Sequence, residues 1–452
     1  MSSLSESSVL AGAAGVSTGY TIDQSIRFNY GDSPYMYRSA SSTGNRKKFT
    51  NSFWYKRGAK LGDYQALPSV HTTESGGSYG MYLSTANVLH VFTYYSGSWA
   101  GLHYSNQVFR DVSAWYHFVW AVDTTEAVAS ERVRIFVNGE RITSWSSESY
   151  PSLNQDTSFN NSGEQHNVGK DANGSYYVDG YGAEMHYIDG YAYGPEYFGE
   201  FKEDTDIWIP KEYTGSYGTN GFYIKGSDSS ALGTDSSGNG NNLTVSGLAA
   251  NDQRTDSPTN NHCVMNPIVP GSATFVNGNL DLSYSASSWT TARGTVAIPN
   301  NSGIYYYEAK VISHAIYLSF GWGDVNMGPN QNNNPATPKF YVYSDNNGKY
   351  YSSTDDGTIG DGFTNNDVIG LWYDSDSTTN NLKFYRNGTL QATKSFDFSD
   401  TTSIHGHVTH VAPVTQFYSS NSVEYRFDSA YWTNAPAGIT SENAVTTNNI
   451  GS

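Results

Sequence analysis

RVRIFVNGERI at residues 132–142 and LKFYRNGTL at residues 382–390 decide the fold of this chain. Each stretch places an Asn-Gly pair, Asn138-Gly139 or Asn387-Gly388, between two runs of strand-forming residues. Asn and Gly tolerate positive φ at both central positions of a two-residue turn, so Asn-Gly is a strong short-range hairpin signal. An apolar run ending in an acidic turn precedes each hairpin: HFVWAVDTT in the first half and DVIGLWYDSDSTT in the second. We therefore expect two β domains of related plan.

The composition indicates a β protein with a weakly charged surface. A length of 452 residues fits two domains of ordinary size. The chain has 25 Lys+Arg against 42 Asp+Glu, a net charge of −17, which disfavours nucleic acid and anionic membranes as partners. Only 15% of the residues are charged, whereas about a quarter is usual. Ser, Thr, Asn, Gly and the 37 Tyr must therefore supply outward-facing strand positions, as in secreted or particle-bound β proteins.

The N-terminal region and the cysteine content favour a virion component. Cys263 is the single cysteine, so no intramolecular disulfide can form, and we expect a packed small residue there. No Lys or Arg precedes Arg27, and the longest early apolar run is VLAGAAGV, which predicts neither a signal peptide nor membrane insertion. An extracellular-looking protein of this kind is often made in a host cytoplasm and released on the virion. We expect that localisation here.

Turn-rich segments divide the chain into five parts. Residues 1–19 are rich in Ser, Ala and Gly and are predicted to form a flexible N-terminal arm that could dock the protein. Residues 20–225 and 271–440 each contain regularly spaced short strands. Residues 226–270 are turn-forming, which predicts a linker or crossover, and residues 441–452 form a C-terminal tail. The fold class is therefore all-β, with two tandem antiparallel β-sandwich (jelly-roll) domains and little helix.

Two families share these elements. The order SIRFNY, AWYHFVWAVDTT, VNG, YVDGYGAEMHYIDG within residues 20–223 resembles the laminin-G/concanavalin-A-like jelly roll. YYYEAKV, GWGD, NNDVIGLWYD and LKFYRNG within residues 271–432 resemble a SPRY domain. The whole arrangement resembles structural proteins of marine tailed phages. Asp374 is followed by SDSTTNN instead of the usual basic motif, so the peptide-ligand rules of animal SPRY domains are not carried over.

Catalytic motifs are weak. GGSYG places Ser78 in a G-x-S-x-G pattern, but MYLST follows as a predicted strand where a nucleophile elbow requires a helix. The E-x-D-x-x-E pattern of laminarinase-type relatives is absent. Glu203, Asp204 and Asp206 lie in a predicted surface turn, where solvated acids are the alternative to a glycoside hydrolase pair. We therefore expect no enzyme, and a polysaccharide depolymerase stays open through residues distant in sequence.

No cofactor is expected, although two kinds of metal site stay open. His405, His407 and His410 in HGHVTH are weak candidates for a transition metal, and surface or subunit-contact histidines are the alternative. On one strand, His410 would face away from the other two, so three ligands would need a bend. Asx-rich loops at residues 235–242, 345–349 and 374–380 could hold structural calcium, although Asx residues are also what tight turns prefer.

Aromatic side chains supply the candidate binding residues. The run at residues 92–104 holds a predicted hairpin tip with aromatics on both sides, and such rings can stack on the apolar faces of sugars. The alternative is that these rings fill the sandwich core. The same two alternatives apply to the tryptophan of GWGD in the second half, which either belongs to the core or serves as a loop anchor. The glycan-binding candidates are Tyr94, Tyr95, Trp99, His103, Tyr104, Trp322 and Asp324.

We expect a phage virion surface protein, a head or tail fibre or decoration, whose lectin-like domains adhere to host-surface glycans. Its partners would be other virion proteins, through the N-terminal arm, and the host glycan. We expect a homo-oligomer on the particle. A purely structural virion protein is the alternative, and a depolymerase is a further one.

Overall fold

Both Asn-Gly hairpins form with positive φ at both turn residues, as predicted. The φ angles are 48° at Asn138 and 84° at Gly139, and 48° at Asn387 and 78° at Gly388. These values identify the same primed turn in both hairpins. The flanking strands are β9 (Val133–Val137), β10 (Glu140–Arg141), β29 (Leu382–Arg386) and β30 (Thr389–Lys394).

Each hairpin is tied to the strand before it in the same way. The Asn138 side-chain oxygen accepts a hydrogen bond from the backbone N–H of His117 at 2.7 Å. The Asn387 side-chain oxygen accepts one from the backbone N–H of Val368 at 2.9 Å. The two halves of the chain therefore share the hairpin and also its attachment.

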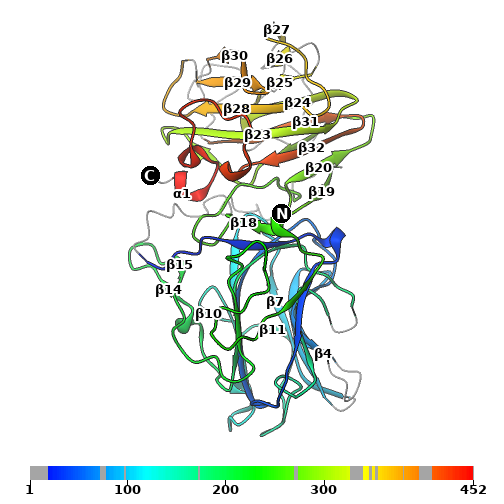
Figure 1. The fold of residues 1–452 in the computed structure, drawn as a ribbon, viewed down its shortest axis with the longest axis vertical. Helices are drawn as coiled ribbons and strands as arrows, with labels where there is room; N and C mark the ends of the chain where they lie inside the picture. The colour runs from blue at the N-terminus through cyan, green and yellow to red at the C-terminus, as the bar shows by residue number, and fades with distance from the viewer. Residues whose placement is uncertain are drawn as a thin grey trace. The chain divides into compact units, whose positions relative to one another are not determined.

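The computed structural model describes residues 19–71, 78–95, 98–171, 174–268, 273–325, 340–345, 349–351, 355–379, 381–395 and 410–450. The chain divides into two compact units, Ser17–Thr259, the first unit, and Asn260–Ser452, the second unit. Strands dominate both (Figure 1), which confirms the predicted all-β class.

Two eight-stranded antiparallel sheets form the sandwich of the first unit. The β3 sheet has the order β10-β9-β8-β3-β13-β1-β18, with β16 also paired to β13, and the β5 sheet has the order β11-β7-β6-β5-β4-β12-β2-β17. The other strands of the β3 sheet are β8 (Trp115–Asp123), β3 (Lys48–Arg57), β13 (Gly180–Asp189), β1 (Ser25–Phe28), β18 (Gln253–Arg254) and β16 (Phe222–Ile224). Those of the β5 sheet are β11 (Trp145–Ser149), β7 (Ser98–Val108), β6 (Val88–Tyr95), β5 (Ser78–Leu83), β4 (Gln65–His71), β12 (Gln165–Val168), β2 (Tyr35–Ser39) and β17 (Thr244–Ser246).

Alternate residues of these strands fill the first core. Phe49, Trp120 and Phe159 lie at its centre, with the Phe49 and Phe159 rings stacked at 4.2 Å and Trp120 edge-on to both at 5.3 Å. Edge-to-face and offset aromatic pairs stabilise a core beyond the area they bury.

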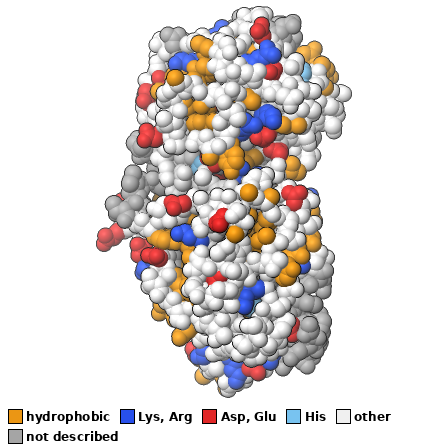
Figure 2. Space-filling model, viewed as in Figure 1, with side chains coloured by type: hydrophobic (Ala, Val, Ile, Leu, Met, Phe, Trp, Pro, Cys, Tyr) orange, Lys and Arg blue, Asp and Glu red, His pale blue; other side chains and the backbone are white. Residues whose placement is uncertain are grey.

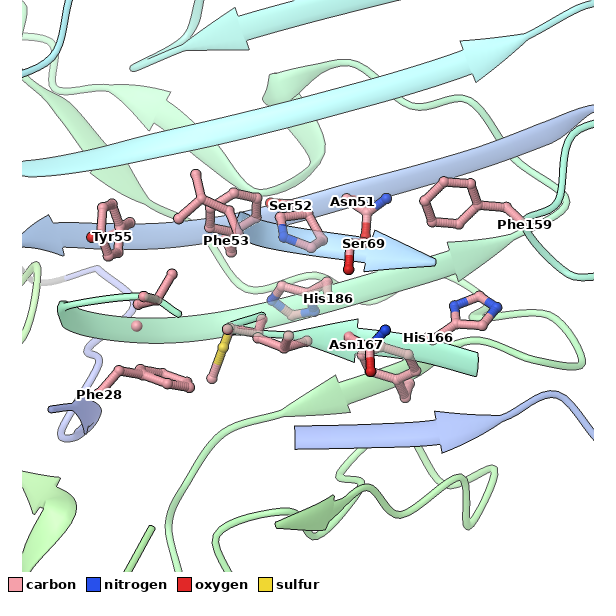
Figure 3. Close-up of a pocket in the computed structure, with 18 residues that line it drawn as sticks. Phe28, Asn51, Ser52, Phe53, Tyr55, Ser69, Phe159, His166, Asn167 and His186 are labelled. Carbon is pink, nitrogen blue, oxygen red and sulfur yellow. The ribbon is translucent and has the colours of Figure 1, made fainter. Parts of the chain in front are cut away.

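A cavity of about 40 Å³ remains inside the first unit. Asn51 from β3, His166 from β12 and His186 from β13 are among its lining residues (Figure 3). Small-molecule sites usually enclose roughly 300–1,000 Å³. This cavity has room for a few water molecules and not for a sugar.

The chain between β13 and β16 covers the outer face of the β3 sheet. It contains the hairpin of β14 (Gly199–Phe201) and β15 (Trp208–Pro210). Phe198, Tyr213 and Tyr217 pack there against Val119 and Ile188. The outer face of the β3 sheet is therefore covered. The second outer face of the sandwich is that of the β5 sheet.

Residues 226–259, expected as part of a linker or crossover, contribute strands to the first unit. β17 pairs with β2, and β18 pairs with β1. Buried ion pairs reinforce this attachment, with Arg27 to Asp252 at 2.9 Å and Lys56 to Asp256 at 2.8 Å. Hydrophobic packing adds to this attachment, because Leu232 and Leu243 are buried in the first core.

The second unit also contains two antiparallel sheets. The β23 sheet has the order β19-β20-β32-β23-β28-β29-β30, and the β24 sheet has the order β21-β31-β24-β25-β26-β27, with β22 also paired to β31. The other strands of the β23 sheet are β19 (Thr274–Val276), β20 (Asp281–Tyr284), β32 (Asn421–Arg426), β23 (Ile304–Ser313) and β28 (Val368–Asp374). Those of the β24 sheet are β21 (Thr290–Arg293), β31 (His410–Tyr418), β24 (Ile316–Asp324), β25 (Phe340–Ser344), β26 (Lys349–Tyr351), β27 (Asp355–Thr358) and β22 (Ile298–Pro299).

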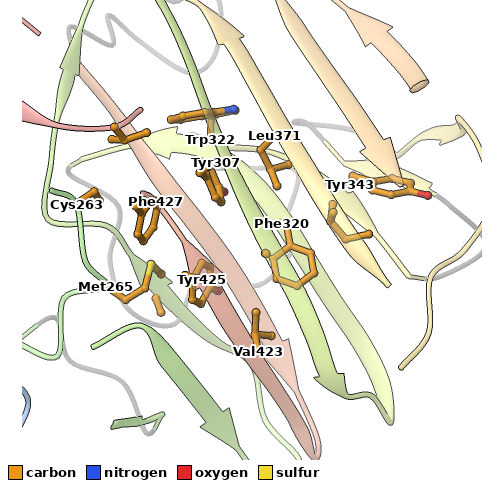
Figure 4. Packing of buried hydrophobic residues seen from close by; sticks show 14 of the residues in the cluster. Cys263, Met265, Tyr307, Phe320, Trp322, Tyr343, Leu371, Val423, Tyr425 and Phe427 are labelled. Atoms are coloured by element: carbon orange, nitrogen blue, oxygen red, sulfur yellow. The ribbon is translucent and has the colours of Figure 1, made fainter. Parts of the chain in front are cut away.

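Aromatic rings also dominate the second core (Figure 4). Trp322 is completely buried there and packs edge-on against Tyr307 at 5.0 Å. Cys263 lies in the same cluster, as expected of a packed small residue.

In the part of the chain that the structure describes, helical structure is confined to single turns. No helix among the described residues is long and apolar enough to span a bilayer. The short turns are η1 (Tyr30–Asp32), η2 (Ala129–Glu131), η3 (Pro195–Tyr197), η4 (Ala250–Asp252), η5 (Ser429–Tyr431), η6 (Ser441–Asn443) and α1 (Thr447–Ile450).

Candidate functional site

A row of aromatic rings crosses the outer face of the β5 sheet. Met81, Leu83, Leu89 and Val91 of β5 and β6 belong to the core, so the residues that alternate with them point outward. The strand register places Tyr82 opposite His90, and His90 opposite Tyr104. Three neighbouring strands therefore each contribute one ring at the same level.

These rings pack closely with three others. His90 stacks on Tyr104 at 3.7 Å, and Tyr82 stacks on Phe92 at 4.6 Å. Tyr64 lies 5.9 Å from His90. Tyr176 lies 5.3 Å from Tyr64 and 6.5 Å from Tyr82. We call this group the aromatic face: Tyr64, Tyr82, His90, Phe92, Tyr104 and Tyr176.

Tyr176 is held in a strained conformation. Its φ angle is +50°, and the residue is 46% exposed. Most described non-glycine residues with positive φ are Asn, Asp or Ser, and the exceptions are Tyr176, Glu184 and Tyr317. A bulky residue in this region is a genuine outlier that costs of order 1–3 kcal/mol. The loop is fixed by the backbone bond from Ala66 N–H to the Tyr176 carbonyl at 2.8 Å. Such strain is typical of residues retained for function.

Polar groups and a second ring cluster share this sheet face. The Gln165 amide donates to the Asn167 side-chain oxygen at 2.7 Å on β12. Beyond them, Tyr35 stacks on Tyr37 at 5.5 Å, and the Lys170 ammonium lies 3.6 Å from the Tyr35 ring centroid. The face thus combines flat apolar surfaces with hydrogen-bonding side chains.

The aromatic face is uncharged near neutral pH. Burial lowers the pKa of the His90 imidazole, which is therefore neutral at pH 7. Burial, with the nearby Tyr64 phenol, raises the pKa of Tyr104. Neutral rings of this kind can stack on the apolar face of a planar or ring-shaped ligand.

Residues 30–190 match the family described as the Concanavalin A-like lectin/glucanases superfamily. The match includes every residue of the aromatic face and both sheets' central strands. The first unit is therefore a concanavalin A-like jelly roll. No curated protein sequence matches the chain significantly.

The chain also matches parts of several solved structures. The SPRY domain of human HERC1 is 18% identical and covers 34% of this chain and 91% of its own, with a TM-score of 0.28. A SAP-like pentraxin from Limulus polyphemus is 12% identical and covers 38% of this chain and 78% of its own, with a TM-score of 0.29. A candidate carbohydrate-binding protein from Bacteroides ovatus is 14% identical and covers 52% of this chain and 60% of its own, with a TM-score of 0.36.

The predicted glycan-binding residues of the concanavalin A-like unit separate into three groups. Tyr104 belongs to the aromatic face. His103 points the opposite way, buried between the Trp145 and Tyr150 rings at 5.1 and 4.9 Å, so it packs in the core. Strand pairing sets residue 94 opposite residue 99 in the β6–β7 hairpin. The side chains of Tyr94, Tyr95 and Trp99 lie outside the described residues.

Trp322 and Asp324 are not surface groups. Trp322 fills the second core, and Asp324 at the end of β24 is buried as well. For these two residues the structure agrees with the core alternative, and neither side chain is open to a ligand.

Sequence reasoning missed most of the aromatic face. His90 and Phe92 alternate with core residues in NVLHVFTYY, and Tyr82 does so in GSYGMYLST. That alternation was the available signal. Tyr64 and Tyr176 are 112 positions apart in the sequence, so only the folded structure shows that both belong to the aromatic face.

The metal candidates receive no new support. His405 and His407 lie outside the described residues, and His410 is the first residue of β31. Among the described residues, no group of three His, Cys, Asp or Glu side chains is placed to hold a metal ion. In the first Asx-rich loop, Asp235 accepts backbone N–H bonds from Tyr223, Ser237 and Asn241. That carboxylate is engaged by its own turn.

His117 contacts Ser52, but its tautomer does not allow it to activate the serine as a nucleophile. Trp208 donates its indole N–H to His117 Nδ1 at 3.0 Å, and an indole nitrogen can only donate. Neutral His117 therefore carries its proton on Nε2, which donates to Ser52 Oγ at 2.9 Å. Burial, followed by the charge of His186, lowers the pKa of His117 to about 3. This pair cannot act as serine and general base.

Glu184 is held in a closed, buried network. Tyr20 and Tyr223 donate their hydroxyls to it at 2.8 and 2.5 Å, and His186 Nε2 lies 3.5 Å away. Burial raises the pKa of Glu184, but the bonds from His186 and the two tyrosines outweigh burial and leave the pKa lowered. The network fastens the first described residues to β13.

The remaining catalytic candidates lie in unsuitable places. Ser78 begins strand β5, with no helix after it as a nucleophile elbow requires. Glu203, Asp204 and Asp206 lie exposed in the turn between β14 and β15. These acids are solvated rather than paired across a cleft.

Proposed function

We propose that this chain is a non-enzymatic carbohydrate-binding protein of a phage virion surface, and that the aromatic face binds saccharide. The stacked rings of His90 and Tyr104 carry the proposal, because both are partly exposed on the outer face of a concanavalin A-like sheet, with the buried Tyr82 ring beside them. Tyr176 supports it, since an exposed aromatic residue is kept there in a strained conformation.

Binding would use stacking for affinity and a side-chain amide for orientation. The apolar faces of successive sugar rings would lie on Tyr104 and Tyr176, while the partly exposed Gln165 meets the hydroxyl edges. One such site of millimolar affinity contributes about −4 kcal/mol. Several copies on one particle would raise the effective affinity by orders of magnitude. We therefore infer a homo-oligomer or a multicopy arrangement.

A tailed-phage fibre or head decoration suits the composition. In the space-filling view, acidic and basic side chains are scattered among uncharged polar and apolar groups (Figure 2). A surface of this kind suits adhesion to neutral glycans better than attraction to polyanions. A purely structural virion protein is the second candidate, favoured by the many half-buried tyrosines that would equally pack against protein.

Substitutions in the aromatic face test saccharide binding. We expect Tyr104→Ala and Tyr176→Asn each to weaken binding about tenfold, because each removes one stacking ring. Tyr197→Asn is the matched control, since Tyr197 is 45% exposed on the same unit but lies on η3, away from this face. The measurement is native electrophoresis through gels containing a soluble neutral β-glucan, α-mannan or galactan.

The net charge of −17 drives the protein through such gels, so retardation reports binding. Retardation that the two face variants retain in full would contradict the aromatic face as the site. New reducing ends in the same polysaccharides would instead indicate a depolymerase.

Removal of the N-terminal arm tests docking to the particle. Deletion of residues 1–18 should abolish incorporation into virions while both units remain folded. The deletion must stop before Tyr20, because its hydroxyl donates to Glu184 in the first unit. Antibody labelling of purified particles gives the readout, and normal incorporation of the shortened chain would refute docking through the arm.

A further inference from the structure

A triangle of aromatic rings lies at one end of the β24 sheet in the second unit. Trp289 precedes β21, Tyr317 lies near the start of β24, and Tyr418 ends β31. The Tyr317 ring lies 5.7 Å from Trp289 and 5.6 Å from Tyr418, and Trp289 and Tyr418 are 5.4 Å apart. We call these residues the aromatic triad.

Tyr317 is strained in the same manner as Tyr176. Its φ angle is +53°, and the residue is 40% exposed. The pairing of β24 with β31 shifts between Ile316 and Leu318, so Tyr317 is the residue of a β-bulge. Bulges re-aim a side chain and are enriched beside functional sites. Tyr176 and Tyr317, the exposed tyrosines with positive φ among the described residues, thus each belong to a ring cluster on an outer sheet face, one in each unit.

Two buried polar side chains hold the strained segment in place. Asp345 accepts the backbone N–H groups of Tyr317 and Leu318, both at 2.9 Å. Asn421 accepts the N–H of Ala315 at 3.0 Å and donates to the carbonyl oxygens of Ile316 and Tyr418 at 3.0 and 2.7 Å. Strained residues persist only where the surrounding structure fixes them in this way. The segment is therefore built to present Tyr317.

The surroundings of the aromatic triad favour a sugar as its occupant. Ser287 and Ser288 are exposed beside Trp289, and Ser420 is exposed beyond Tyr418. A small apolar platform with a hydroxyl fringe matches a saccharide, which has an apolar ring face and a hydroxyl edge. Rigid aromatic side chains also lose little entropy on contact.

We propose that Trp289, Tyr317 and Tyr418 form a second saccharide-stacking site, independent of the aromatic face. This inference deepens the proposed carbohydrate binding and rests on it. Each chain would then hold two sugar-binding sites, one on each compact unit, and a single polymer or neighbouring glycans could engage both.

The test compares the full-length protein with variants in the same neutral polysaccharide gels. Trp289→Ala and Tyr317→Asn should each weaken binding about tenfold relative to wild type. Asparagine is chosen because it tolerates positive φ and keeps the backbone bond to Asp345. Its thermal unfolding midpoint should not fall, which separates lost binding from lost folding. Leu390→Asn on β30 is the matched control, because Leu390 is 49% exposed and lies on the other sheet.

Combination with Tyr104→Ala separates the two sites. The triple variant Tyr104→Ala/Trp289→Ala/Tyr317→Asn should bind more weakly than either site's variants alone. If the triad variants bind like wild type and the triple variant binds like Tyr104→Ala, the triad proposal fails and the aromatic face stands. A triad that contacts protein would give that same result. If the triad variants abolish binding and Tyr104→Ala has no effect, the triad stands and the aromatic face fails. Retardation in no gel would overturn both.

Discussion

Lowering the pH from 7 to 5 is expected to destabilise the first unit by about 6 kcal/mol. Burial lowers the pKa of His103 to about 4 and that of His166 to about 3, the latter with a contribution from Arg38. Burial and the charge of His186 lower the pKa of His117 to about 3. An unfolded histidine has a pKa near 6.5, so at pH 5 the unfolded chain binds protons that the folded unit does not.

The sign of the effect follows from this difference in protons. Stability is complete above about pH 6.5 and falls as the pH drops toward the folded-state values, at roughly 2 kcal/mol per histidine by pH 5. Burial raises the pKa of Asp179, which acts in the opposite direction. Urea unfolding at pH 5, 6 and 7 measures the sum.

Replacing two of these histidines provides the control. His103→Gln/His166→Gln should remove about two thirds of the pH dependence, because glutamine does not titrate. Both imidazoles have a buried Nε2 without a hydrogen-bond partner in the described structure, so few bonds are lost. A double variant that loses as much stability on acidification as wild type would refute the assignment.

Asp256→Ala is expected to destabilise the first unit by about 3–5 kcal/mol, the usual result of breaking one side of a buried ion pair. The Lys56 side chain is fully buried and lies 2.8 Å from Asp256. Trp115 also donates its indole N–H to that carboxylate at 3.2 Å. Without the aspartate, the buried Lys56 ammonium would lie beside the apolar side chain of the introduced alanine.

Asp204→Ala serves as the matched control for that substitution. Asp204 pairs with Lys202 at 3.5 Å, but its side chain is 68% exposed. Exposed pairs contribute about 0–1 kcal/mol. Urea unfolding of both variants at pH 7 measures the contrast. Equal stability of Asp256→Ala and wild type would refute a stabilising role for the Lys56–Asp256 ion pair.

The strand content and hairpins could be predicted because they depend on local chemistry. Asn138-Gly139 and Asn387-Gly388 can supply positive φ at two successive positions, and few other pairs can. The attachment of residues 226–259 could not be predicted in the same way. β17 and β18 lack large buried apolar side chains, and the ion pairs to Arg27 and Lys56 join residues about 200 positions apart.

The candidate site was predicted only in part, because it depends on strand register. Tyr104 was found from its aromatic surroundings, whereas His103 has the same surroundings and faces the core. One residue of register decides between them. The positions of Tyr176 and Tyr317 follow from strained backbone conformations, which composition and alternation do not reveal.

Because the single cysteine is buried, its reaction with a thiol reagent reports local opening of the second unit. Cys263 lies inside the core of the second unit, where a Cβ built on Gly294 would come within 2.6 Å of its sulfur. A thiol reagent can reach that sulfur only when this unit opens, and unfolding confined to the first unit releases no thiol. The rate of native-state labelling therefore measures the opening equilibrium of one half of an intact chain, with no engineered probe.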